Sequence, residues 1–139
     1  MTEHLKSPLE VLPEDECWHL LSQRTVGRLA VVINNTPDIF PVNFKVWKQA
    51  IFLQTAPGLK LAAAVLNPSV AFEVDAVDEQ REVGWSVVVR GTAIELERLD
   101  ELLLADDLGV RPWAAGVKNR YLKIEPTSVT GRLLPGRPL

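Results

Sequence analysis

The alternation of apolar and polar residues is the feature that most restricts how this chain can fold. Along residues 70–75, the apolar side chains of Val70, Phe72 and Val74 alternate with small or acidic residues. A period of two is typical of a β-strand with one face in the core and the other in water. Similar short runs follow one another, separated by turn residues such as Asn34-Asn35. This succession predicts antiparallel strands and argues against a parallel sheet alternating with long helices.

We expect a mainly β chain that forms a single domain over residues 1–139, with short flanking helices. The expected strands span residues 28–33, 38–47, 50–55, 70–75, 83–97, 117–125 and 128–134, and the expected helices span residues 13–24, 59–66 and 99–105. Residues 106–116 are expected to be irregular, and Gly91 to mark a bulge or a bend. Strands of this length leave exposed edges unless the sheet closes, so we expect a closed or nearly closed antiparallel barrel.

Charge and cysteine content restrict the functional class. The net charge is −3, the pI is about 5.4, and the basic residues are scattered, which argues against nucleic acid as the main partner. Cys17 is the only cysteine, so no intramolecular disulfide can form and a reducing compartment is expected. No apolar run is typical of a membrane span or signal peptide. We therefore expect a soluble cytoplasmic protein.

Lys60 is the first candidate for ligand binding. It is the only charged residue in the segment 49–72 and comes at the start of an expected helix. A helix N-terminus offers unpaired backbone N–H groups and a partial positive charge. With the Thr55 hydroxyl, the Lys60 ammonium would complete a pocket for an anion. The alternative is a lysine whose stem is buried while its ammonium reaches water.

Two expected strands carry further candidates. Asn43 is a polar residue in the apolar segment Phe40–Phe44, and its partners would be either a heteroaromatic ligand or the neighbouring backbone. Trp85 and Ser86 lie in the expected strand over residues 83–97 and should face opposite sides of it. The alternative for that strand is an ordinary core strand ending in an aromatic residue. Trp113, in a segment rich in Pro and Gly, would cover a ring-shaped ligand or seal an interface.

The sequence predicts no metal site and no catalytic side chain. The two His residues, His4 and His19, are too few for a zinc site. Cys17 and His19 are two positions apart and would point in different directions on a helix. The glycine-rich fingerprints of dinucleotide folds and of serine hydrolases are absent.

Taken together, these segments resemble the flavin-binding split β-barrels of the pyridoxamine 5′-phosphate oxidase-like family. The resemblance covers residues 14–134, and its order and spacing carry it more than any one motif. The matching segments are Gly27-Arg28-Leu29-Ala30-Val31, Phe40-Pro41-Val42-Asn43-Phe44, residues 55–68, Trp85–Thr92, Arg111-Pro112-Trp113-Ala114 and Thr130-Gly131-Arg132.

The resemblance implies a homodimer with two FMN molecules in clefts at the subunit interface. The isoalloxazine ring would lie along Pro41, Val42, Asn43 and Phe44, and its phosphate against Thr55 and Lys60. The partner subunit would contribute Trp85, Ser86 and Val87. The expected cofactor-binding set is completed by Leu61 and Trp113.

The expected function is that of an FMN-dependent oxidoreductase acting on a small molecule. Authentic pyridoxamine phosphate oxidation is not expected, because the chain lacks a basic cluster for a substrate phosphate. Two alternatives share the fold: a reductase that uses a deazaflavin cofactor, and a flavin-binding module without enzymatic activity. The flavin itself would perform the electron transfer, which agrees with the lack of a catalytic cluster.

Overall fold

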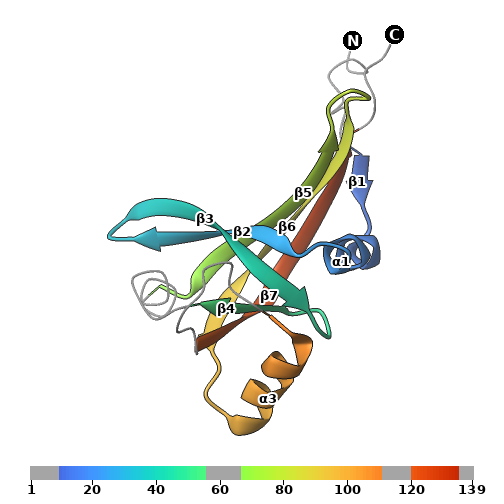
Figure 1. Cartoon of the computed structure of the whole chain (residues 1–139). Helices are drawn as coiled ribbons and strands as arrows, with labels where there is room; N and C mark the ends of the chain where they lie inside the picture. Colours follow the sequence, from blue (N-terminus) through green and yellow to red (C-terminus); the bar gives the residue numbers. More distant parts are fainter. Residues whose placement is uncertain (1–9, 56–66, 111–119, 135–139) are drawn as a thin grey trace.

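The strands form a closed ring. The computed structural model describes residues 10–55, 67–110 and 120–134. Within these ranges the seven strands have the order β1-β7-β4-β3-β2-β5-β6, and β6 also pairs with β7 (Figure 1). All pairs are antiparallel. The prediction of a mainly β antiparallel barrel is confirmed.

The described elements are seven strands and two helices. Their bounds are β1 Glu10–Leu12, α1 Glu14–Ser22, β2 Val26–Ile33, β3 Thr36–Val46, β4 Ile51–Thr55, β5 Ser69–Asp78, β6 Val83–Glu95, α3 Leu99–Leu108 and β7 Arg120–Leu134. Neither described helix is long and apolar enough to cross a membrane. The helix expected over residues 59–66 lies outside the described residues.

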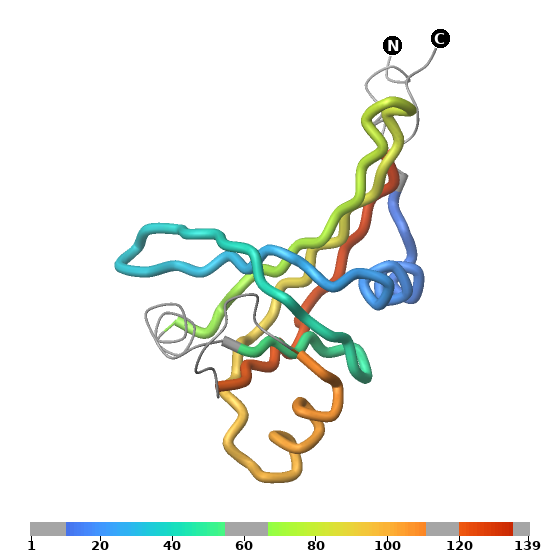
Figure 2. The backbone as a smooth tube through the Cα atoms, in the orientation of Figure 1, coloured from blue at the N-terminus to red at the C-terminus, as the bar shows by residue number. Residues whose placement is uncertain are grey.

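Two of the strand pairs that close the ring are short. β2 meets β5 through three residue pairs, and β3 meets β4 through three, whereas β6 and β7 share twelve. Beyond the short β2–β5 pairing, the β2–β3 and β5–β6 hairpins extend in different directions (Figure 2). The barrel is therefore split, as the family resemblance implies.

The expected turns form as short hairpin loops. Asn34 and Asn35 have φ values of 50° and 62°, and Lys48 and Gln49 have φ values of 49° and 57°. Two successive residues with positive φ make the turn whose twist matches that of paired strands. These turns fix which residues of β3 lie opposite those of β2 and β4.

Three sequence predictions were wrong in detail. The two strands expected over residues 117–134 are one strand from Arg120, because β6 pairs with both halves and the register shift beside Gly91 absorbs the irregular residues near Pro126. α3 continues past Ala105 to Leu108 and ends at Gly109, whose φ is +76°. β1, which has three residues, was missed because so short a segment carries no periodic signal.

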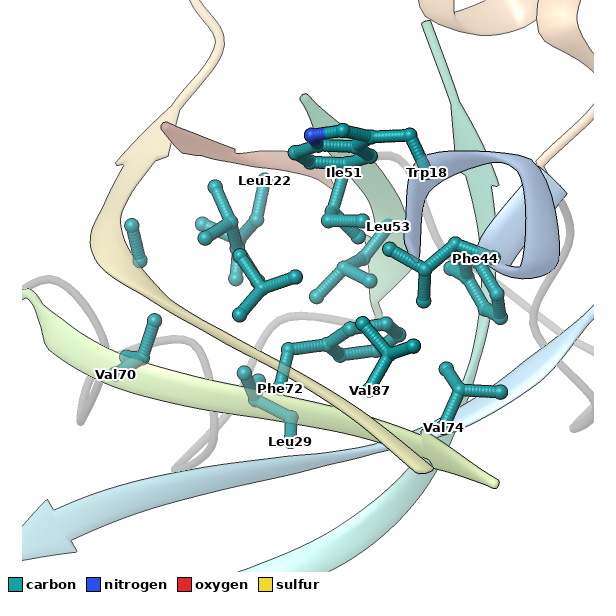
Figure 3. Packing of buried hydrophobic residues seen from close by; sticks show 14 of the residues in the cluster. Trp18, Leu29, Phe44, Ile51, Leu53, Val70, Phe72, Val74, Val87 and Leu122 are labelled. Atoms are coloured by element: carbon teal, nitrogen blue, oxygen red, sulfur yellow. The ribbon is translucent and has the colours of Figure 1, made fainter. Parts of the chain in front are cut away.

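The core lies inside the ring and is covered at one side by α1. Phe44 and Phe72 pack edge to face, with ring centroids 4.9 Å apart, and Trp18 and Leu21 of α1 pack against the same cluster (Figure 3). A smaller cluster joins α3 to β4 and β7. It comprises Ala50, Phe52, Leu96, Ala105, Val110 and Tyr121. The two clusters cover opposite sides of β4.

Gly27 gives a direct test of this packing. A Cβ atom on Gly27 would lie 2.3 Å from Cζ of Phe72, whose ring is fully buried. We expect Gly27→Ala to lower the free energy of unfolding by roughly 1–3 kcal/mol, measured by urea denaturation. Combined with Phe72→Leu, the change should cost less than the sum of the two single substitutions. Full additivity would contradict the contact.

Candidate functional site on the outer face of the sheet

The four residues expected along a flavin ring divide between two faces of β3. Phe44 is 1% exposed and Val42 packs against the core, so both side chains face inward. Pro41 is exposed and Asn43 half-buried, and both lie on the outer face of the strand. Only Pro41 and Asn43 thus offer side chains to a ligand on this face, whereas Val42 and Phe44 hold the strand to the core.

β6 divides its expected ligand residues in the same way. Val87 is fully buried in the core, and Ser86 lies half-buried on the outer face. Trp85 is on the core side, where the guanidinium carbon of Arg24 lies 5.8 Å from its ring centroid. Trp85 and Arg24 also line a cleft of about 600 Å³ beside the β5–β6 hairpin. Ser86 and Trp85 therefore face different surroundings, as expected.

The structure does not bring Asn43 and Ser86 into contact within one chain. Strands β2 and β5 lie between β3 and β6. Three interstrand spacings, or about 14 Å, therefore separate the two residues across the outer face.

An ion-pair cluster that sequence reasoning missed occupies the space between them. Arg28 of β2 lies opposite Glu73 of β5, and its Nη1 atom is 3.3 Å from Oε1 of Glu73 and 3.5 Å from Oδ2 of Asp75. All three side chains are on the outer face. One guanidinium thus serves two carboxylates at the centre of the candidate surface. The alternation of residues 70–75 predicted a wet face here, but nothing in it identified β2 as the neighbouring strand.

The crowding of the two carboxylates changes the acidity of Glu73. Partial burial, followed by the hydrogen bond and charge of Asp75, raises the pKa of Glu73 to about 7, although Arg28 acts in the opposite direction. A carboxyl group in this environment exchanges a proton near neutral pH. The outer face therefore changes charge in the range where most enzymes work.

The expected anion pocket lies largely outside the described residues. Lys60, Leu61 and Trp113 belong to segments that the structure does not describe. Thr55 is the last residue of β4, and its backbone lies opposite that of Arg120 in β7. The Arg120 side chain forms an ion pair with Glu95. Within residues 10–55, 67–110 and 120–134, no three His, Cys, Asp or Glu side chains are placed to hold a metal ion.

Glu73→Gln should reduce the dependence of stability on pH. The carboxyl group titrates near 4.5 when unfolded and near 7 when folded, so its stabilising contribution is complete below the first value and lost as the pH rises through the second. We expect the parent to lose roughly 1 kcal/mol relative to the variant between about pH 5 and about pH 8, with screening by solvent included. Urea denaturation across this range measures it.

Glu79→Gln is the matched control, because Glu79 is an exposed carboxylate in the β5–β6 turn. This variant should follow the parent at every pH. Parallel pH profiles for the parent and Glu73→Gln would contradict the raised pKa of Glu73.

Comparison with known proteins agrees with this architecture. Residues 13–133 match the sequence model of a family described as pyridoxamine 5′-phosphate oxidase. The chain is similar to a crystal structure from Corynebacterium glutamicum, provisionally described as a pyridoxamine 5′-phosphate oxidase. Identity is 39%, coverage is 95% of this chain and 98% of that chain, and the TM-score is 0.80.

Two further relatives come from mycobacteria. A structure described as the FAD binding protein from Mycobacterium smegmatis is 36% identical, with coverage of 88% of this chain and 96% of that chain and a TM-score of 0.76. The uncharacterised protein Rv0080 of Mycobacterium tuberculosis is 33% identical over 86% of this chain and 82% of its own length. The match to the family model, which spans nearly all of the described fold, shows that this chain belongs to the pyridoxamine 5′-phosphate oxidase family.

Proposed function

We propose that the protein binds a flavin on the outer face of β3, β2, β5 and β6 and uses it as an oxidoreductase. The observation that carries this proposal is the composition of that face. Apolar Pro41 and Val88 flank the ion-pair cluster, and Asn43 and Ser86 lie half-buried beside it. A flavin needs apolar contacts and a few hydrogen-bonding groups around its ring, and this surface offers both kinds of group.

The relatives support a flavin more strongly than any other cofactor. The Mycobacterium smegmatis relative is described as an FAD binding protein and is similar to this chain over nearly its whole length. FMN was the expectation from the family resemblance. FMN and FAD carry the same isoalloxazine ring, so the outer face suits either molecule.

The described residues would position the flavin and set the charge around it. Asn43 and Ser86 offer amide and hydroxyl groups to polar ring atoms. Arg28 offers a cation that Glu73 and Asp75 hold in place at 3.3 and 3.5 Å. A bound flavin supplies the electron transfer itself, and the protein supplies orientation and electrostatics. Proton exchange at Glu73 would make that electrostatic environment depend on pH.

Binding and turnover are separable tests. Titration with FMN or FAD should perturb the flavin absorbance and quench its fluorescence, and a reduced nicotinamide should then bleach the bound flavin. Absence of binding at tens of micromolar of either flavin would contradict the proposal. A stable complex that no nicotinamide reduces would support a flavin-binding module instead, and preference for a deazaflavin in competition would support the reductase alternative.

A cytoplasmic location also forms part of the proposal. Cys17 is a free, fully buried thiol packed against the core. Burial is the main cause that raises the pKa of this thiol, so the reactive thiolate is disfavoured. A free cysteine of this kind is compatible with a reducing compartment.

Lys60→Ala should weaken flavin binding without unfolding the protein. A charge-assisted hydrogen bond to a phosphate contributes roughly 1.5–3 kcal/mol, so we expect about a tenfold to hundredfold loss of affinity. Fluorescence titration measures the affinity for FMN and for FAD. Lys48→Ala, which changes an exposed lysine of the β3–β4 turn, is the control and should bind like the parent. Unchanged affinity in Lys60→Ala would remove this residue from the site.

The protein should be a homodimer whose assembly is linked to flavin binding. A cofactor that binds only the dimer favours it by mass action. Light scattering should give about twice the chain mass of 15.4 kDa, and FMN should raise the melting temperature. Trp85→Ala should weaken both assembly and binding, whereas Trp47→Ala, at a site that is 41% exposed, should not. A monomer that binds flavin in a complete site would contradict shared clefts.

A further inference from the structure

The outer face contains a second recess, distinct from the ion-pair cluster. It lies beside the β2–β3 hairpin, where β5 and β6 pass that hairpin, and it has a volume of about 400 Å³. We call it the hairpin groove. Its lining comes from Ala30–Val32 of β2, Pro37 of β3, Ser69–Ala71 of β5, Arg90–Thr92 of β6 and Thr127 of β7.

One side of the groove is apolar and the other side carries polar groups. Ala30, Val32 and Pro37 belong to the hairpin and form the apolar side. Ser69 lies opposite Thr92 across the β5–β6 ladder, so their hydroxyl groups are neighbours on the outer face. No lining residue is acidic. A recess of this size and composition suits a flat apolar group that carries an anion.

Arg90 supplies the positive charge of the groove. It lies opposite Ala71, is exposed, and makes no ion pair with any residue in the three described ranges. Arg28 lies on the same face, two residues along β2 from Ala30, which shares a row with Arg90. In contrast to Arg90, Arg28 forms ion pairs with two carboxylates. The guanidinium of Arg90 therefore remains available to a phosphate at the groove.

A local irregularity of the sheet accompanies Arg90. The β6–β7 register shifts between Arg90 and Gly91, which leaves Thr127 as an extra residue on β7. The Thr127 hydroxyl donates to the Arg90 carbonyl at 3.1 Å, and a Cβ atom on Gly91 would lie 2.2 Å from the Glu125 carbonyl oxygen. Bulges redirect side chains next to binding sites. Gly91 and Thr127 thus hold the backbone that carries Arg90 in a specific geometry.

We propose that the hairpin groove binds the adenosine monophosphate half of FAD, with Arg90 on the phosphate and the adenine against the apolar side. This proposal rests on the flavin function proposed above. Pro37 at the groove and Asn43 at the ring site lie on the same face of β3, six residues and therefore about 20 Å apart. A flavin ring at Asn43 reaches the groove only as a dinucleotide, because a mononucleotide ends short of it.

The test compares FMN, FAD and AMP in the parent and in Arg90→Ala. The parent should bind FAD more tightly than FMN, and Arg90→Ala should weaken FAD about tenfold to hundredfold while FMN affinity stays unchanged. Arg81→Ala, which removes an exposed arginine from the β5–β6 turn, is the matched control and should change neither affinity. Thr92→Val, which removes one groove hydroxyl at nearly constant shape, should weaken FAD to a smaller extent.

AMP alone separates this proposal from the proposed function. In the parent, AMP should shift the backbone amide resonances of residues 69–71 and 90–92, and these shifts should disappear in Arg90→Ala. AMP binding here without binding of either flavin would leave the groove intact and overturn the flavin function. Equal affinities for FMN and FAD, or equal losses of both in Arg90→Ala, would overturn the groove as a nucleotide site. Absence of AMP shifts in the parent would do the same.

Discussion

The pairing of β7 with three other strands is the interaction on which the rest of the structure depends. β7 pairs with β1 through three residues, with β4 through five and with β6 through twelve. The β6–β7 ladder closes the ring, and β4 is held to β3 by only three pairs. Without β7, the sheet would have two exposed edges and an uncovered core. The bulge at Gly91 lets this long ladder bend enough to close.

Closure separates two environments on the same strands. Side chains that face inward, such as Phe44 and Val87, are buried and rigidly packed. Their neighbours Asn43 and Ser86 lie on the opposite face, where a ligand has access. A position in the strand thus decides whether a side chain faces the core or the outer surface. Four adjacent residues of β3 that the family resemblance assigns to one site consequently lie in two different environments.

The outer face is itself divided by charge. Arg28 is held by Glu73 and Asp75 at the centre, and Arg90 lies two rows away without an acidic partner in the described ranges. In the first arrangement, partial burial and the neighbouring Asp75 raise the pKa of Glu73 to about 7. The second leaves a cation next to hydroxyl groups and an apolar wall. A ligand with a polar aromatic ring and a phosphorylated tail matches this division better than a ligand with only one of these parts.

The amino-acid sequence by itself determined the class of fold, most strand positions, the hairpin turns and the bulge at Gly91, because these depend on periodicity and turn residues that act over a few positions. It did not show that residues 120–134 form one strand, since β6 supports both halves of that strand from a distance. Nor could it place Arg28 beside Glu73, 45 residues later, or Arg90 beside the β2–β3 hairpin. Only the tertiary structure decided those contacts, because strand order and register are set by closure of the whole ring around its core.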